Sequence, residues 1–528
     1  MLLSFFLAIL PLLVVLVGIV YLQRTGWEMA IVGLLLTALL AVFYFHTQPS
    51  VVLWATVYGV LKSFGIGIAV LGTMLMIFLM KEAGALDTIS KAVSQVAATP
   101  EEKALFIGIA FGSLVTSLGV VTPALFPPLL LAMGFSPFAA VAIAVLGYNA
   151  TTSFALLSLP VTLPAEVWGF DAQLFTYKIC LYLPVISTAI SFGMLYLIGG
   201  KESIKKGWKL AVVIGLSIGL SALLFSALKS PVMLIGVLSG LTSMGAFVLY
   251  TKSWKRPSSG VDKRELLRAL SPWILLITFA AIVSVPWVTS HLSSLLGVVN
   301  VRGEVVKDGP EVVHVFANKY IDFNVLTQVY LWIFIATLLS IPILKLDREK
   351  IRRAGRVWLK RMWGPFIAYS LFFAISYVFA WSAMEITNGV LTKTGYYSDY
   401  NINLVVGSYL SQIFGTFYIY VAPFLGLFGA VVGGSETGSN VLFYKIQKTA
   451  AEDIGYGKES EFMTIYAAHA NAGGIASAIT PSKVNNATAT IGAGREIESA
   501  VMRKNIVLVL LLTTLTGIMT ALFLHLSI

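Results

Sequence analysis

Cysteine, histidine and charged residues are all scarce in this chain. Cys180 is the only cysteine, which excludes an intrachain disulfide and a metal site built from cysteines. The five histidines have no metal-ligand spacing, and no credible Ser/His/Asp triad accompanies them. Charged residues make up only 12% of the chain, far less than in a soluble globular domain. We therefore expect no enzyme, no bound metal and no cofactor.

Long apolar segments take the place of the missing charge. Hydrophobic residues form 58% of the 528 residues, and the mean hydropathy is +0.87. A helix that crosses the hydrocarbon core of a bilayer needs about 20 mostly apolar residues. We predict an all-α, multi-pass protein of the cell membrane with about twelve transmembrane helices. The predicted spans are residues 3–22, 28–45, 53–80, 136–159, 176–199, 207–227, 231–250, 272–290, 324–344, 364–384, 460–480 and 505–526.

The formal net charge of +11 is arranged as in a membrane protein rather than a nucleic-acid-binding protein. The basic residues gather in short loops at 201–209, 252–268 and 345–361. An excess of Lys and Arg marks cytoplasmic loops, so we place these three loops inside the cell. Counting spans outward from them puts both termini outside.

The same count places the segment 291–323 outside the membrane. Apolar and polar residues alternate over 301–316, around the turn pair Asp308-Gly309. This pattern favours a small external β-hairpin, with an irregular loop as the alternative.

Two further apolar regions, about 104–133 and about 403–448, have helix-breaking clusters in their middles. Gly, Pro, Ser and Thr gather there, and a continuous helix tolerates such clusters poorly. Irregular backbone at membrane depth persists only where protein or a water-filled cavity satisfies its polar groups. We predict a re-entrant hairpin in each region and expect the turns to be functional.

The two hairpin regions belong to an internal repeat. Residues 111–126, FGSLVTSLGVVTPALF, align without gaps with residues 428–443, FGAVVGGSETGSNVLF. An Asn-Ala pair follows each, at Asn149 and at Asn471, and precedes a proline, Pro160 and Pro481, at nearly the same spacing. The predicted topology gives the two units opposite orientations, and broken helices in inverted repeats mark the substrate site of secondary transporters. The first repeat, a two-span linker and the second repeat then cover residues 1–200, 201–271 and 272–528.

The second repeat resembles the lactate permease family. Residues 434–443, GSETGSNVLF, match the family's glycine, serine, acid, threonine, small residue, serine and asparagine followed by Val-Leu-Phe. Further matches follow in the family's order at Thr449-Ala450, Ile454-Gly455, Ala470-Asn471, Gly473-Gly474, Ile479, Pro481-Ser482, Ala487 to Thr490 and Gly492. The first repeat departs from the family, because Thr116 to Pro123 stand where an acid and a Gly/Ala-rich stretch are usual. The resemblance implies proton symport of lactate, glycolate or a related 2-hydroxy acid.

A small carboxylate that leaves water for the membrane interior needs new hydrogen-bond partners. Half-helix N-termini supply free N–H groups and about half a positive charge, which suits an anion. We therefore predict that hydroxyl, amide and glycine positions of the broken segments bind a small organic anion, with mere close packing of small residues as the alternative. These positions are Thr116, Ser117, Gly119, Thr122, Asn149, Thr151, Thr152, Ser435, Thr437, Gly438, Ser439, Asn440, Asn471, Gly473, Gly474 and Ser477.

Two titratable residues of the second repeat are candidates for the coupled proton. Glu436 is the first candidate for the coupled proton, because an acid at membrane depth is costly unless it is neutral, paired or hydrated. An acid at a water-exposed hairpin mouth is its alternative. His469 is the second candidate, since an unperturbed histidine titrates near neutral pH, and a structural histidine is the alternative. Coupling to Na⁺, a different organic anion and an anion-selective channel remain as other functions, and the oligomeric state stays open.

Overall fold

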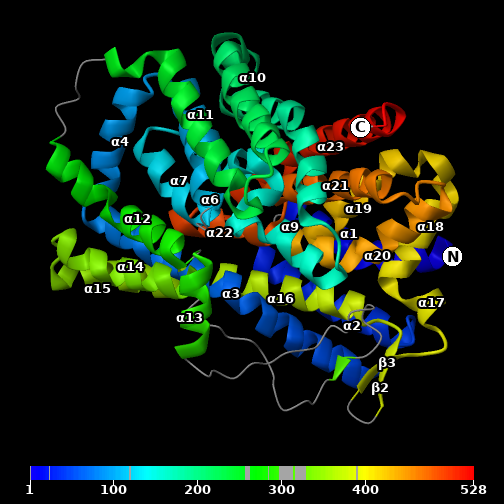
Figure 1. Ribbon diagram of the computed structural model, residues 1–528. Coiled ribbons are helices and arrows are strands. Elements are labelled where there is room, and N and C mark those ends of the chain that lie inside the picture. The colour runs from blue at the N-terminus through cyan, green and yellow to red at the C-terminus, as the bar shows by residue number, and fades with distance from the viewer. Residues whose placement is uncertain are drawn as a thin grey trace.

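The computed structural model describes residues 2–22, 24–117, 121–255, 262–283, 285–295, 313–314, 329–387 and 390–527. Helices make up nearly all of this part of the chain, and one small sheet lies at its edge (Figure 1). The first half contains α1 (Leu2–Val20), α2 (Gly26–Phe43), α3 (Pro49–Glu82), α4 (Ala85–Val96), α5 (Pro100–Ala104), η1 (Leu105–Phe111), α6 (Gly112–Ser117), α7 (Thr122–Ala132), α8 (Pro137–Leu146), η2 (Gly147–Phe154), α9 (Ala155–Trp168) and α10 (Ala172–Ala227).

The middle of the chain continues with helices that pack around this first half. They are η3 (Val232–Leu234), α11 (Ile235–Thr251), η4 (Ser253–Lys255), α12 (Lys263–Val283), α13 (Pro286–Leu295), α14 (Val329–Ile343), α15 (Arg348–Arg361) and α16 (Trp363–Ala380). The last part contains α17 (Tyr397–Tyr400), α18 (Ile402–Phe414), η5 (Gly415–Phe417), α19 (Tyr418–Gly433), α20 (Glu436–Asp453), α21 (Glu459–Ile475), η6 (Ala476–Ala478), α22 (Pro481–Ile491) and α23 (Arg495–His525).

Helix α10 consists of two helical arms that reverse at Gly200. This residue has φ 61° and ψ −143°, a conformation that glycine adopts freely. The arms run antiparallel and side by side, since Gly215 lies against the backbone of Thr188 and Gly219 against that of Pro184. Small residues let membrane helices approach this closely. The two arms correspond to the two spans predicted in this stretch.

The small sheet joins segments that are far apart in the sequence. Strands β2 (Met384–Thr387) and β3 (Val390–Lys393) form an antiparallel hairpin, and β1 (Val313–His314) pairs with the other edge of β3. The predicted hairpin over 301–316 falls outside the described residues except for β1. The sequence did not predict the hairpin at 384–393, which therefore adds a β element to the predicted all-α fold.

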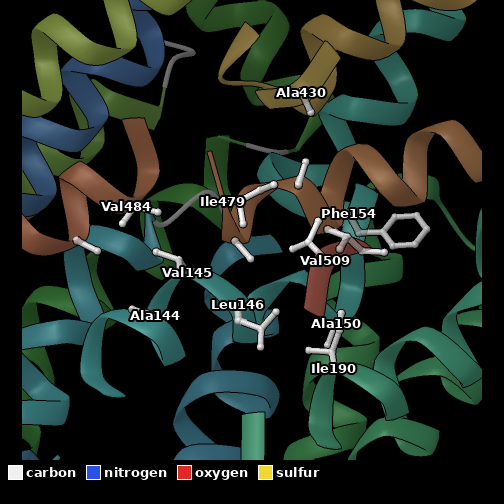
Figure 2. Close-up of a cluster of buried hydrophobic side chains, with 14 of the residues drawn as sticks. Ala144, Val145, Leu146, Ala150, Phe154, Ile190, Ala430, Ile479, Val484 and Val509 are labelled. Atoms are coloured by element: carbon white, nitrogen blue, oxygen red, sulfur yellow. The ribbon is translucent and has the colours of Figure 1, made fainter. Parts of the chain in front are cut away.

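A dense apolar core surrounds the two segments where spanning helices are interrupted. Figure 2 shows side chains from α8, η2, α10, α19, α22 and α23 meeting there. Phe154 of η2 and Ile479, which follows η6, are at most 4% exposed. The interrupted segments are therefore held from several sides. The other labelled side chains of this core are Ala144, Val145, Leu146, Ala150, Ile190, Ala430, Val484 and Val509.

Eight helical stretches of the described chain are long and apolar enough to cross a membrane. One of them is α10, which holds two of the predicted spans. Three shorter apolar helices, Pro49–Leu61, Thr122–Ala132 and Leu331–Ile343, accompany them. The chain is thus a multi-pass helical membrane protein.

The three segments predicted as basic loops are mostly helical, within α10, α12 and α15, and they lie at one end of the bundle with the sheet at the other. Each of them contacts the segment 82–101 through one hydrogen bond. Arg353 Nε donates to Glu82 at 2.9 Å, Thr88 Oγ1 donates to Glu265 at 3.3 Å, and Ser203 Oγ donates to Glu101 at 2.8 Å. The sheet instead meets the start of α3, where Gln48 N donates to Met384 O. Helix α3 has 34 residues and is therefore about 50 Å long. This separation agrees with a common side for the basic loops.

Two predicted span limits are wrong. The spans predicted to end at 159 and 480 continue beyond their interruptions as α9 and α22, so the broken spans cover 137–168 and 459–491. Pro481 is the first residue of α22, where its missing N–H costs no intrahelical hydrogen bond. This proline begins a half-helix instead of ending a span.

We expect Gly215→Ala to destabilise the protein by about 1–3 kcal/mol, the usual range for overpacking, because the added methyl group meets the backbone of Thr188. Gly245→Ala in α11 is the matched control, since nothing lies within 4 Å of its added Cβ. Alanine there also favours a helix by about 0.5–1 kcal/mol relative to glycine. Thermal unfolding in detergent compares the two variants, and equal melting temperatures would contradict the close packing of the α10 arms.

Candidate functional site

Four helices, α7, α9, α20 and α22, each begin directly after an interruption of the helical backbone. Residues from the first turn of all four line one cavity. Its volume is about 100 Å³, counted as the space that the centre of a water molecule can occupy. About 10–15 Å³ of such space holds one water, so the cavity accommodates several waters or one small molecule. The lining residues are Thr116, Val121, Thr122, Pro123, Tyr148, Asn149, Thr152, Ala155, Leu156, Pro160, Gly434, Ser435, Glu436, Thr437, Ser477 and Lys483.

The four helix starts give the cavity a positive electrostatic character. The first N–H groups of a helix have no partner within the helix, and the N-terminal end of its dipole is positive. In α20 the hydroxyl of Ser435 accepts a hydrogen bond from Gly438 N at 3.3 Å and caps the helix. Four helix N-termini around one small space form a site that stabilises an anion.

The backbone at the interruptions adopts conformations that side chains disfavour. Thr152 has φ 38° and ψ −106°, and Leu156 has φ 52°. Gly434, at the turn between α19 and α20, has φ 65°. Strained non-glycine residues cost about 1–3 kcal/mol each and persist where the surrounding structure enforces them. All three residues line the cavity, so two strained side-chain-bearing residues and one left-handed glycine contribute to its wall.

Glu436 and Lys483 bring opposite charges to the cavity wall. Glu436 is the first residue of α20 and is only 7% exposed. Its Oε1 atom has no hydrogen-bond partner among the described residues. Lys483 lies in the first turn of α22, where its ammonium donates to Ser477 Oγ and lies 6.0 Å from the centre of the Tyr148 ring. The two charged groups are close enough to interact, and each offsets part of the cost of burying the other.

His469 lies behind the cavity wall in a complete hydrogen-bond network. Gln447 Nε2 is 2.9 Å from His469 Nδ1 and also donates to the carbonyl oxygen of Ala422. The Oε1 atom of Gln447 accepts from Tyr418, which fixes the orientation of the amide. Nδ1 of His469 is therefore an acceptor, and the opposite nitrogen, Nε2, donates to Ser439 Oγ at 3.1 Å. This assignment describes a neutral histidine.

The structure brings eight of the predicted site residues into the cavity wall. Residues from both of the predicted repeats are among them. The eight are Thr116, Thr122, Asn149, Thr152, Ser435, Glu436, Thr437 and Ser477. Gly119 lies outside the described residues.

The other predicted residues that the structure describes lie around the cavity instead of lining it, all of them buried except the half-buried Gly438. Asn471 accepts from Thr152 Oγ1 at 3.1 Å and so ties the two interrupted spans together. Asn440 donates to the carbonyl oxygen of Pro160 at 2.9 Å, which joins α20 to α9. A Cβ added at Gly474 would lie 3.1 Å from Glu436 Oε2, so glycine gives the acid its room. Ser117, Thr151, Gly438, Ser439, Gly473 and His469 are likewise outside the wall.

Sequence analysis missed Lys483 and Tyr148. Lys483 follows the predicted end of a span at 480 and carried no prediction, although the structure places it in the cavity wall. The signal that identifies it is Pro481, because proline favours the first position of a helix and a half-helix therefore follows. Tyr148 precedes the repeat-related Asn149, and its residue type carries no comparable signal.

Interrupted helices that meet at a small cavity holding a few polar and charged groups, within a multi-pass membrane protein, are the architecture of a transporter. A family model described as L-lactate permease matches residues 4–527, and the chain belongs to this family. The glycolate permease GlcA of Escherichia coli is 25% identical over 98% of this chain and 95% of its own length. The L-lactate permease of Salmonella typhimurium is 24% identical over 98% and 96%. The protein is accordingly a transporter and not an enzyme.

A solved structure gives a more distant similarity. MtrF of Neisseria gonorrhoeae, described with a class of antimetabolite efflux pumps, is 13% identical and covers 95% of this chain and 96% of its own. The TM-score is 0.33, which is too low to assign a common fold.

We expect Thr437→Cys to react with a small hydrophilic thiosulfonate reagent and Ser439→Cys to remain unreactive. Thr437 lines the cavity, whereas Ser439 is 1% exposed and faces His469. The native Cys180 is fully buried and serves as the unreactive background. Mass spectrometry of labelled protein in membranes measures both reactions, and equal labelling of the two variants would contradict the position of the cavity wall.

Proposed function

We propose that this protein is a proton symporter that carries lactate, glycolate or a related small 2-hydroxy acid across the cell membrane, with the cavity as its substrate site. The observation that carries the proposal is a lysine and four helix N-termini that share one small cavity with a buried acid, Glu436. Membership in the L-lactate permease family supports the substrate class.

Lys483 is the proposed partner of the substrate carboxylate. Its ammonium group has three donors, and Ser477 accepts only one of them. Helix N-termini supply further N–H donors, so the carboxylate exchanges its hydration for several hydrogen bonds. The charge-assisted bond from the ammonium is the strongest of these interactions.

The rest of the cavity matches the remainder of a small hydroxy acid. The hydroxyl oxygens of Thr116 and Thr152, which donate to Thr122 and Asn471, can accept from the 2-hydroxyl group, and Thr437 adds a third hydroxyl to the wall. An apolar side of the wall, which includes Val121 and Leu156, faces the methyl group of lactate. The small volume excludes long acyl chains, so selectivity for short monocarboxylates follows from size as well as charge.

Charge balance at the site explains how proton and substrate are coupled. In the empty site, anionic Glu436 and cationic Lys483 sum to zero. Binding of an anion alone leaves a net negative charge at membrane depth, which is expensive. Protonation of Glu436 frees Lys483 for the substrate and restores a net charge of zero. The empty and fully loaded states are therefore the two that reorient across the membrane, which makes transport a symport of one proton and one monocarboxylate.

We assign the proton to Glu436 and a structural role to His469. The Oε1 atom of Glu436 is unpaired among the described residues and the side chain faces the cavity. His469 already uses Nδ1 as an acceptor from Gln447 and does not line the cavity. A second proton on His469 would face the Gln447 amide donor and break that bond.

An inverted repeat with two re-entrant hairpins and about twelve spans provides the proposed route for alternating access. In support, α6, α7, α8, η2, α9 and α10 follow one another in the same order as α19, α20, α21, η6, α22 and α23. Helices of the two proposed repeats also pack against each other, since α7 contacts α22 and α9 contacts α20. Rocking one repeat against the other would open the cavity to alternate sides.

Lys483→Met should weaken lactate binding by about 10- to 100-fold, because a hydrogen bond to a charged group contributes about 1.5–3 kcal/mol. Lys483→Arg keeps the charge and should retain most of the affinity. The concentration dependence of lactate exchange in proteoliposomes measures both variants. Unchanged affinity in Lys483→Met would remove the lysine from the substrate site.

Glu436→Gln should abolish lactate accumulation driven by a pH gradient while exchange between equal lactate pools persists. Glutamine keeps the shape and mimics the protonated acid, so the loaded state still reorients but cannot release a proton. His469→Gln is the matched control and should still accumulate lactate in response to the gradient.

The same proteoliposomes separate the alternative functions. Accumulation that is lost in His469→Gln but kept in Glu436→Gln would move the proton to the histidine. If both variants accumulate lactate, an imposed Na⁺ gradient tests Na⁺ coupling, and flux that never exceeds equilibrium indicates a channel.

A further inference from the structure

A second buried acid, Glu498, lies at the end of the protein that carries the basic loops. It is in the first turn of α23 and is 2% exposed. Its Oε1 atom accepts a hydrogen bond from the backbone N–H of Gly26 at 2.8 Å, and Oε2 lies 3.4 Å from Asn485 Nδ2. The carboxyl group thus joins the starts of α2 and α23 to the side of α22. Substrate binding in the cavity does not use it.

Helix α22 connects the cavity to Glu498. Lys483 in its first turn lines the cavity, and Ser482 lies beside the wall residue Gly434, where an added Cβ would be 3.3 Å from Ser482 Oγ. Asn485 and Asn486 lie three and four residues after Ser482, so the three side chains share one face of the helix. The face leads along the helix from the cavity to Glu498.

This face carries four buried polar atoms without a hydrogen-bond partner in the described part of the chain. They are Ser482 Oγ, Asn485 Oδ1, Asn486 Oδ1 and Asn486 Nδ2. Ser482 and Asn486 are fully buried, and Asn485 is 6% exposed. An unsatisfied buried polar group costs about 1–3 kcal/mol, and proteins normally satisfy such groups with protein or with buried water. Four of them within five residues form a lining suited to a short chain of waters.

The far end of this face reaches solvent beside charged groups. Glu28 of α2 and Arg495 of α23 form an ion pair at 2.9 Å, and their side chains are 24% and 50% exposed. These are the charged groups that act on Glu498 from the elements packed against it. A proton on Glu498 is therefore one step from the water on the side of the basic loops.

We propose that the Ser482, Asn485 and Asn486 face of α22 is the inner proton passage of the transporter, with Glu498 as its final relay. The proposal rests on the proposed proton coupling through Glu436. A proton released by Glu436 moves along waters held by this face and protonates the Glu498 carboxylate. Glu498 then gives the proton to solvent, so one proton enters and one leaves, and no other bond changes.

Glu498→Gln tests the relay. Glutamine keeps the acceptor for Gly26 N but cannot carry a proton, so the rate of lactate uptake driven by a pH gradient should fall about tenfold or more. Exchange between equal lactate pools, which needs no net proton release, should stay near the wild-type rate. Glu82→Gln is the matched control, since this acid also lies at the basic end and its ion pair with Arg353 is exposed.

Asn486→Leu and Asn486→Ser test the passage itself. Leucine fills the space without polar atoms and should slow gradient-driven uptake as Glu498→Gln does, whereas serine should restore it. A pH-sensitive dye inside the proteoliposomes records proton arrival beside lactate uptake. Wild-type rates in both Glu498→Gln and Asn486→Leu, or equal loss of uptake and exchange, would overturn the passage. Wild-type lactate uptake without proton entry would overturn the proton symport itself.

Discussion

The cost of holding charge at membrane depth governs this structure. A carboxylate or an ammonium group alone in the bilayer interior is expensive, and the protein places one of each, Glu436 and Lys483, in the same cavity. The interrupted helices follow from that requirement, because only irregular backbone brings free N–H groups and polar side chains together at this depth. Strain at Thr152 and Leu156 is a local cost of the arrangement, and the apolar core around η2 and η6 keeps it in place.

The sequence predicted the parts of the site that have local signals. Clusters of Gly, Ser and Thr located the interruptions, since these residues disfavour continuous helix wherever they occur. Comparison of the two repeats then brought Thr116 and Thr437 together although more than three hundred residues separate them. The role of Asn471 was less accessible. Its side chain holds Thr152 instead of facing the cavity, and hydrogen-bond direction depends on packing that a motif does not encode.

Features that depend on long-range geometry were missed. Lys483 was hidden because a hydropathy window ends where polar residues begin, and α22 is a short polar helix that follows α21 and η6. The hairpin at 384–393 was missed for a related reason. It follows an apolar helix directly, and its partner strand at Val313 is distant in sequence. The inverted repeat and the twelve spans remain predictions.

The reversal within α10 has a consequence for the biosynthesis of the protein. Its two arms are neighbours in sequence and pack backbone against backbone at Gly215 and Gly219. Contacts between adjacent segments form early because closing a short loop costs little entropy. The arms can therefore leave the translocon as a finished helical pair. Helix α21, which is made much later, packs against this pair, so the early hairpin serves as a template for the second interrupted span.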